Sequence, residues 1–237
     1  MTLRYWIFVI LTLLLTTGVS LATYRSAKLL QRWQPEQNLL FLMSENIIRL
    51  LLVALCLGLG WLSGLPPQQF GWTAIAWQQA LVQGLLLGVL MAASFYLGTR
   101  WIVARSGEKF YSRTIVESML PRTGPELVLT AIVMVGVVAA EEMLFRSLLL
   151  GGLQPIAPAA LLLVLSSVLF GVLHLPQGAW GIAGAALAGA LLGALFLVSG
   201  SILAPAAAHY VTNMAQIVQA KRDREREGES QEPALDG

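Results

Sequence analysis

Charged side chains are scarce in this sequence, and cysteine and histidine are scarcer still. Only 12% of the 237 residues are charged and the mean hydropathy is +0.71, whereas a soluble domain carries about 25% charged residues. The single cysteine, Cys56, excludes an intrachain disulfide framework and a cysteine-rich metal site. We therefore expect an all-α integral membrane protein, because runs of about 20 apolar residues cross a bilayer as helices.

Several hydrolase motifs are also missing. Both aspartates, Asp223 and Asp236, lie near the carboxy-terminal end, so an aspartate dyad within the membrane is excluded. No His-Glu-x-x-His sequence occurs, which excludes a zinc protease site on one helix. Ser199-Gly200 lacks the preceding glycine that is typical of a rhomboid-like nucleophile. Hydrolysis could then use a water activated by glutamate and histidine, or a metal such as zinc held by the same residue types.

Seven apolar segments are predicted to be membrane spans. The first is expected to be a retained span, because it is longer than the apolar core of a signal peptide. Basic residues follow the first, third and seventh segments, and the other loops contain no Lys or Arg. The positive-inside rule then predicts an amino terminus outside and a carboxy terminus in the cytoplasm. We expect a multi-pass protein of the cell membrane, although the sequence itself does not distinguish this membrane from that of the thylakoid or the endoplasmic reticulum. The predicted spans are approximately 5–23, 46–64, 78–98, 126–150, 157–175, 180–199 and 202–219.

Two segments outside these spans are rich in charge. Residues 100–124 mix cations with aromatic side chains such as Trp101 and Tyr111, and two interpretations stay open: an amphipathic segment on the membrane surface, or a solvated loop with a short helix. Residues 220–237 alternate in charge and are predicted to form a charged tail, helical at first and then disordered. The mixed signs of this tail argue against binding to nucleic acid.

Acidic and basic groups also occur within an apolar segment, at Glu141, Glu142 and Arg146. Adjacent residues point about 100° apart on a helix, so the two carboxylates cannot play the same role. Glu142 precedes Arg146 by four residues, which favours an ion pair that lowers the cost of burying the arginine. Glu141 has no polar neighbour on its own helix and needs a partner from another helix, or it stays protonated. Beside a histidine it would be well placed as a general base for water.

The only two histidines, His174 and His209, lie in other apolar segments. His174 follows Phe170 by one helical turn, and His209 precedes Asn213 by one turn. A lone histidine in apolar sequence is more often structural, but two of them together with intramembrane carboxylates favour a functional site. Histidine and asparagine can both donate hydrogen bonds to a developing oxyanion. We expect three helices to assemble one buried polar site.

Three short motifs, taken in order, resemble those of the CPBP intramembrane protease family, also called the type II CAAX prenyl protease or Abi family. They are Glu141-Glu142-x-x-x-Arg146, Phe170-x-x-x-His174 and His209-x-x-x-Asn213. The resemblance covers roughly Leu127 to Gln219. We therefore divide the chain into amino-terminal spans with a cytoplasmic loop (1–125), a catalytic membrane domain (126–219) and the charged tail (220–237).

The resemblance implies a membrane-embedded endopeptidase that hydrolyses peptide bonds of membrane-associated proteins or peptides, including prenylated proteins of the CAAX type. By similarity, Glu141 and His174 would activate the attacking water. His209 and Asn213 would stabilise the oxyanion at the scissile carbonyl. The motif residues that would support this site are Glu142, Arg146 and Phe170.

The resemblance leaves the question of a cofactor open. Members of the family have been described as metalloproteases, and the candidate ligands for a divalent metal such as zinc are Glu141, His174 and His209. The same motifs also fit a water activated by glutamate without a metal. The expected partners are the lipid bilayer and a membrane-associated substrate.

Two other functions remain as alternatives. A non-catalytic immunity or chaperone-like membrane factor would keep the same fold without turnover. A proton-coupled transporter would use Glu141 and the histidines as a relay. It would also need polar residues across several spans, whereas the second and third spans offer little beyond Arg49 and a few glutamines.

Overall fold

The computed structural model describes residues 1–30, 38–110, 112 and 117–231. Within these residues the fold is all-α and contains no strand, which confirms the predicted fold class. Each of the seven predicted apolar segments corresponds to one helix. The helices are α1 (Leu3–Leu30), α2 (Met43–Ser63), α3 (Trp77–Ser106), α5 (Gly124–Glu142), α6 (Ala159–Val172), α7 (Gly178–Ser199) and α8 (Leu203–Gln231).

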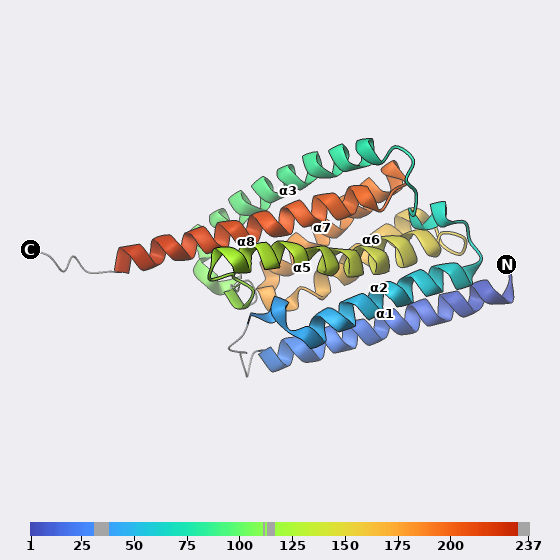
Figure 1. Cartoon of the computed structure of the whole chain (residues 1–237), viewed down its shortest axis with the longest axis horizontal. Helices are drawn as coiled ribbons and strands as arrows, with labels where there is room; N and C mark the ends of the chain where they lie inside the picture. The colour runs from blue at the N-terminus through green and yellow to red at the C-terminus, as the bar shows by residue number, and fades with distance from the viewer. Residues whose placement is uncertain (31–37, 111, 113–116, 232–237) are drawn as a thin grey trace, which may run out of the picture.

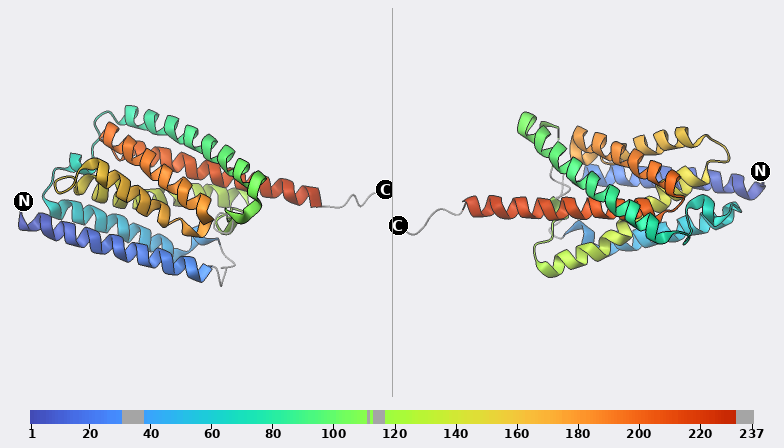
Figure 2. Two further views of the ribbon diagram at one scale, coloured as in Figure 1. Left: turned by 180° about the vertical axis from the view of Figure 1, so that it is seen from behind. Right: turned by 90° about the horizontal axis from the view of Figure 1, so that it is seen from above.

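The helices run roughly along one long axis, and the start of α1 and the end of α8 lie at opposite ends of the molecule (Figure 1, Figure 2). Five helical segments of the described chain are long and apolar enough to cross a bilayer, which is consistent with a multi-pass membrane protein. The two other helices are α6, which has only 14 residues, and α8, whose second half is charged.

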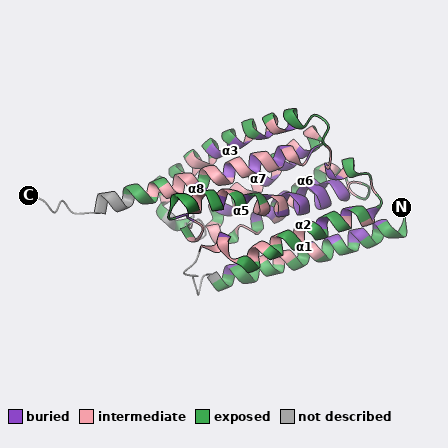
Figure 3. Ribbon diagram, viewed as in Figure 1, coloured by how far each residue is buried: buried purple, intermediate pink, exposed green. Residues whose placement is uncertain are grey.

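The centre of the bundle is a π-helix. α5 does not stop at Glu142 but continues as the π-helix Met143–Gly152, and all ten of its residues are buried. Phe8 of α1, Phe70, and Phe196 of α7 belong to the same buried cluster as this segment. Figure 3 shows the buried residues concentrated there, whereas the outer faces of α1 and α2 are largely exposed. The end of α5 is therefore enclosed by other helices.

α8 packs closely against α3 because α3 presents glycine at the contact. A Cβ atom on Gly84 or Gly88 would collide with the backbone carbonyl of Ala204 or Ala208, respectively. Small residues permit this kind of close approach between helices in a membrane. Since His209 follows Ala208 directly, the contact with α3 fixes the position of that histidine along the bundle.

Some boundaries differ from those predicted. The fifth span is predicted to end at residue 175, but α6 ends at Val172, so His174 lies in the turn after the helix. α3 extends to Ser106 and includes Trp101, whereas Tyr111 lies outside the described residues. The helical extension expected in the tail is the end of α8, and the disorder expected beyond it falls on residues 232–237, also outside the described part.

Candidate active site

A cavity of about 1350 Å³ opens among the helices and contains the proposed catalytic residues. Its lining includes Glu141, His174, His209 and Asn213, which come from the end of α5, the turn after α6, and α8. Glu142 and Arg146 are not part of the lining; they are buried behind it. The structure therefore separates the predicted catalytic groups, which face the cavity, from two of the predicted supporting groups.

Glu142 and Arg146 form a buried ion pair, as their spacing predicts. The Glu142 side chain is fully buried and that of Arg146 is 2% exposed, with Nη1 of the arginine 3.1 Å from Oε1 of the carboxylate. Nη2 of Arg146 donates a long hydrogen bond of 3.5 Å to the carbonyl of Gly189 on α7. The guanidinium also lies over the ring of Phe170, 4.9 Å from its centroid. Together these contacts hold the buried charge in place.

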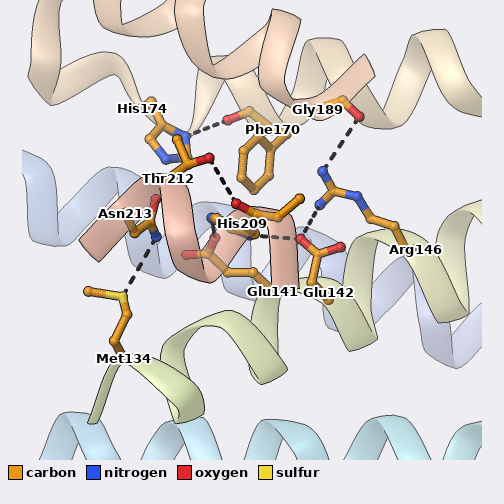
Figure 4. Close-up of polar contacts among 11 residues, drawn as sticks. Met134, Glu141, Glu142, Arg146, Phe170, His174, Gly189, His209, Thr212 and Asn213 are labelled. Carbon is orange, nitrogen blue, oxygen red and sulfur yellow. Dashed lines mark hydrogen bonds and ion pairs between the residues drawn. The ribbon is translucent and has the colours of Figure 1, made fainter. Parts of the chain in front are cut away.

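His209 bridges the two adjacent glutamates. Its Nδ1 lies 2.7 Å from Oε1 of Glu142, and its Nε2 lies 3.5 Å from Oε2 of Glu141 (Figure 4). An ionised carboxylate only accepts hydrogen bonds, so we assign the proton to Nδ1 from this network. The second ring nitrogen is thereby directed at Glu141. The partner that Glu141 requires from another helix is supplied by α8.

Glu141 is the accessible member of the pair. Its side chain is 34% exposed, whereas that of Glu142 is fully buried. Adjacent helical residues point in different directions, and here only Glu141 reaches the cavity. It can therefore meet a substrate and a water molecule, while Glu142 cannot.

His174 is held by the helix that precedes it. Its Nδ1 lies 2.7 Å from the carbonyl oxygen of Phe170. A carbonyl only accepts, so Nδ1 carries the proton, and in the neutral ring Nε2 is left as an acceptor. The Phe170 ring packs between the two histidines, with centroid distances of 4.8 Å to His174 and 5.8 Å to His209. Phe170 thus orients both imidazoles.

Asn213 lies one turn beyond His209 on α8, with its amide weakly engaged. Its Nδ2 has a sulfur partner, Sδ of Met134, at 3.6 Å, and a thioether is a weak acceptor. In Figure 4, His174, Asn213 and Glu141 gather on one side of His209, with Arg146 on the other. The amide is free to donate to a group that enters the cavity.

The structure does not join Glu141 directly to His174. Among the described residues, no hydrogen bond or ion pair links the two, although both line the same cavity. The described side chains also contain no cluster of three His, Cys, Asp or Glu residues suited to hold a metal ion. Glu141, His174 and His209 therefore do not form a preformed ligand set among the described residues.

Sequence reasoning missed three features of the site. The contact between His209 and Glu142 joins residues 67 positions apart, and no local spacing reveals it. Met134 was not recognised as the neighbour of Asn213. Arg49 lines the cavity from α2, and its only signal in the sequence is that it is a lone cation within an apolar segment.

Comparison with known protein families identifies the part of the chain that carries this site. Residues 123–215 match the family described as "Type II CAAX prenyl endopeptidase Rce1-like". This segment, 93 of the 237 residues, is similar to the Rce1-like family. It contains all three motifs and confirms the family resemblance seen in the sequence. The Rce1-like family supports protease activity in general. Neither curated proteins nor solved structures gave a match to the chain.

Proposed function

We propose that the protein is an intramembrane endopeptidase that cleaves membrane-associated proteins or peptides, including prenylated ones, with a water molecule activated by Glu141 and His174. The observation that carries the proposal is the position of Glu141. Glu141 faces a cavity that is also lined by His174 and Asn213. Its partner His209 contacts the buried Glu142 through the other ring nitrogen. The cavity is thus surrounded by an accessible base (Glu141), a second hydrogen-bond acceptor (His174) and two possible donors (His209 and Asn213).

The first step is the attack of water on the scissile carbonyl. Glu141 takes one proton of the water as its oxygen bonds to the carbonyl carbon, and Nε2 of His174 accepts a hydrogen bond from the other. The tetrahedral oxyanion receives hydrogen bonds from Nδ2 of Asn213 and from Nε2 of His209 when that nitrogen is protonated.

The second step breaks the carbon–nitrogen bond. Glu141, now a carboxylic acid, passes its proton to the leaving nitrogen as the intermediate collapses, which regenerates the carboxylate. Glu142 and Arg146 take no part in these transfers. Their role is positional, because Glu142 fixes the orientation of the His209 ring.

A second cavity supports a lipid-modified substrate. A groove of about 440 Å³ lies between α1 and the end of α6, and its lining is mostly apolar. It adjoins the catalytic cavity, since residues such as Thr23 and Leu173 line both. An isoprenoid chain in this groove would hold an attached peptide close to the active site. In the predicted orientation in the cell membrane, this peptide would come from the cytoplasm.

A cleavage assay in detergent tests the proposal. Wild-type protein and Glu141→Gln would be compared on a prenylated fluorogenic peptide and on the same peptide without the lipid, each with and without a zinc chelator. Cleavage that requires Glu141 is expected, with lower KM for the prenylated peptide. If Glu141→Gln cleaves as well as wild type, Glu141 is not the base. If wild-type protein cleaves neither peptide, but Glu141→Gln restores function in cells that lack the protein, the protein is a non-catalytic factor.

A further inference from the structure

Arg49 is a partly buried cation that the proposed mechanism does not use. Its side chain is 20% exposed, and Glu45 and Arg49 are the only charged residues of α2. A charge within an apolar membrane helix is costly, and it is usually retained because it pairs with another group or serves a function.

The contacts of Arg49 leave most of its guanidinium group available. Nη1 donates a hydrogen bond of 2.9 Å to Oδ1 of Asn46. Asn46 is itself fixed, because its amide nitrogen donates to the carbonyls of Leu40 and Leu42 at 2.8 and 3.1 Å. Nη2 lies 3.9 Å from Oε2 of Glu45, at the limit of an ion pair, and that carboxylate is 45% exposed. Arginine carries five N–H donors, and in the described residues only one of them is hydrogen-bonded.

The location of Arg49 connects it to the active site. It lines the same cavity as Glu141, and the two side chains are of opposite charge type. The rest of the cavity lining contains more cations than acids. The charged residues of this lining besides Arg49 and Glu141 are Arg100, Arg122, Arg224, Arg226, Glu117 and Asp223.

We propose that Arg49 binds a carboxylate of the substrate inside the catalytic cavity. The proposal rests on the peptidase function above and adds to it a preference for anionic substrates. A guanidinium group binds a carboxylate through two parallel hydrogen bonds, which fixes its orientation as well as its position. Arg49 would also offset the repulsion between that carboxylate and Glu141. The carboxylate could be the free carboxy terminus of a peptide or an acidic side chain.

Three versions of one fluorogenic peptide distinguish the two sources. The first has a free carboxy terminus, the second a carboxamide, and the third a carboxamide with one added aspartate near the end. Cleavage would be measured with Arg49→Gln, with Arg49→Lys, and with Arg105→Gln as the matched control. Arg105 is an arginine of α3 that stacks on Trp101 and does not line the cavity. Binding would be measured separately in the Glu141→Gln background.

The expected result is a loss of preference rather than a general loss of activity. Arg49→Gln should raise KM and Kd for the matching anionic peptide about 10- to 100-fold, the usual effect of a lost hydrogen bond to a charged group. Values for the plain carboxamide should stay within about threefold of the parent protein. Arg49→Lys should retain part of the preference, and Arg105→Gln all of it.

Other outcomes separate this proposal from the peptidase function. An equal effect of Arg49→Gln on all three peptides, or no preference for an anionic peptide in the parent protein, would overturn the carboxylate site. If no peptide is cleaved but an anionic peptide binds in an Arg49-dependent way, the site stands and the peptidase function fails. If cleavage depends on Glu141 but shows no preference for an anionic peptide, the peptidase function stands and the carboxylate site fails.

Discussion

Nδ1 of His209 lies 2.7 Å from Oε1 of Glu142, and this contact ties α8 to the end of α5. The same oxygen is 3.1 Å from the guanidinium of Arg146, so one carboxylate oxygen serves a cation and an imidazole at once. A chain of charges thus leads from the buried core to the cavity. The ring nitrogen that faces Glu141 is oriented by residues that the substrate never touches.

Removal of the Glu142 carboxylate should destabilise the fold. In Glu142→Ala the arginine stays buried without a counterion, which costs about 3–5 kcal/mol. The free energy of unfolding in detergent would show this loss. Glu141→Ala is the matched control, because that side chain is partly exposed and should leave stability nearly unchanged while it abolishes cleavage. Equal stability of the two variants would contradict the assigned supporting role of Glu142.

The amide of Asn213 should affect turnover rather than binding. Asn213→Ala is expected to lower kcat about 10²- to 10³-fold, as the loss of one oxyanion donor does in other hydrolases. KM and unfolding should change little, because the amide has only a weak sulfur contact in the described structure. Met134→Leu removes that sulfur and should retain activity. A higher KM with unchanged kcat would indicate a role for Asn213 in substrate binding instead.

The close contact between α3 and α8 should be essential for the site. In Gly88→Ala the new Cβ would lie 2.8 Å from the carbonyl oxygen of Ala208, next to His209. α8 must then shift, which should reduce cleavage and lower the unfolding temperature. Gly136→Ala on α5 is the control, because its Cβ meets no atom within 4 Å; it should be neutral or stabilising by up to about 1 kcal/mol. Full activity in Gly88→Ala would show that α8 tolerates displacement.

A bulky residue in the apolar groove should impair only lipid-modified substrates. Ser20 lines the groove from α1, so Ser20→Phe should raise KM for a prenylated peptide about tenfold or more, as expected for several displaced methylene groups. The unmodified peptide should be cleaved as before. Leu13→Phe is a control on an exposed position of the same helix outside the groove. If Ser20→Phe leaves the prenylated peptide unaffected, the lipid chain binds elsewhere.

Local spacing predicted one part of the site well. The pairing of Glu142 with Arg146 follows from residues four apart on one helix, and it survives even though the chain changes from α-helix to π-helix at residue 143. The apolar segments likewise predicted the seven long helices of the described residues, because length and hydropathy decide which segments lie in a membrane.

The contacts between helices could not be predicted in the same way. Which carboxylate contacts which histidine depends on the position of α8 along the lengths of α3 and α5. A single sequence gives no direct measure of that position. For this reason the sequence does not reveal which of the two histidines lies against Glu141, and in the structure that ring is the one of His209. The π-helix was also unexpected, because its composition is that of any buried apolar helix.

The π-helix has a consequence for insertions and deletions. Each of its turns closes one residue later than an α-helical turn, so Met143–Gly152 holds extra chain within the centre of the bundle. A deletion of one residue between Ser147 and Gly152 would be absorbed by a return to α-helical winding. The same deletion just before Glu141 would rotate both carboxylates away from α8. Single-residue deletions should therefore be tolerated in the π-helix but not a few residues earlier in α5, although the two segments form one continuous helix.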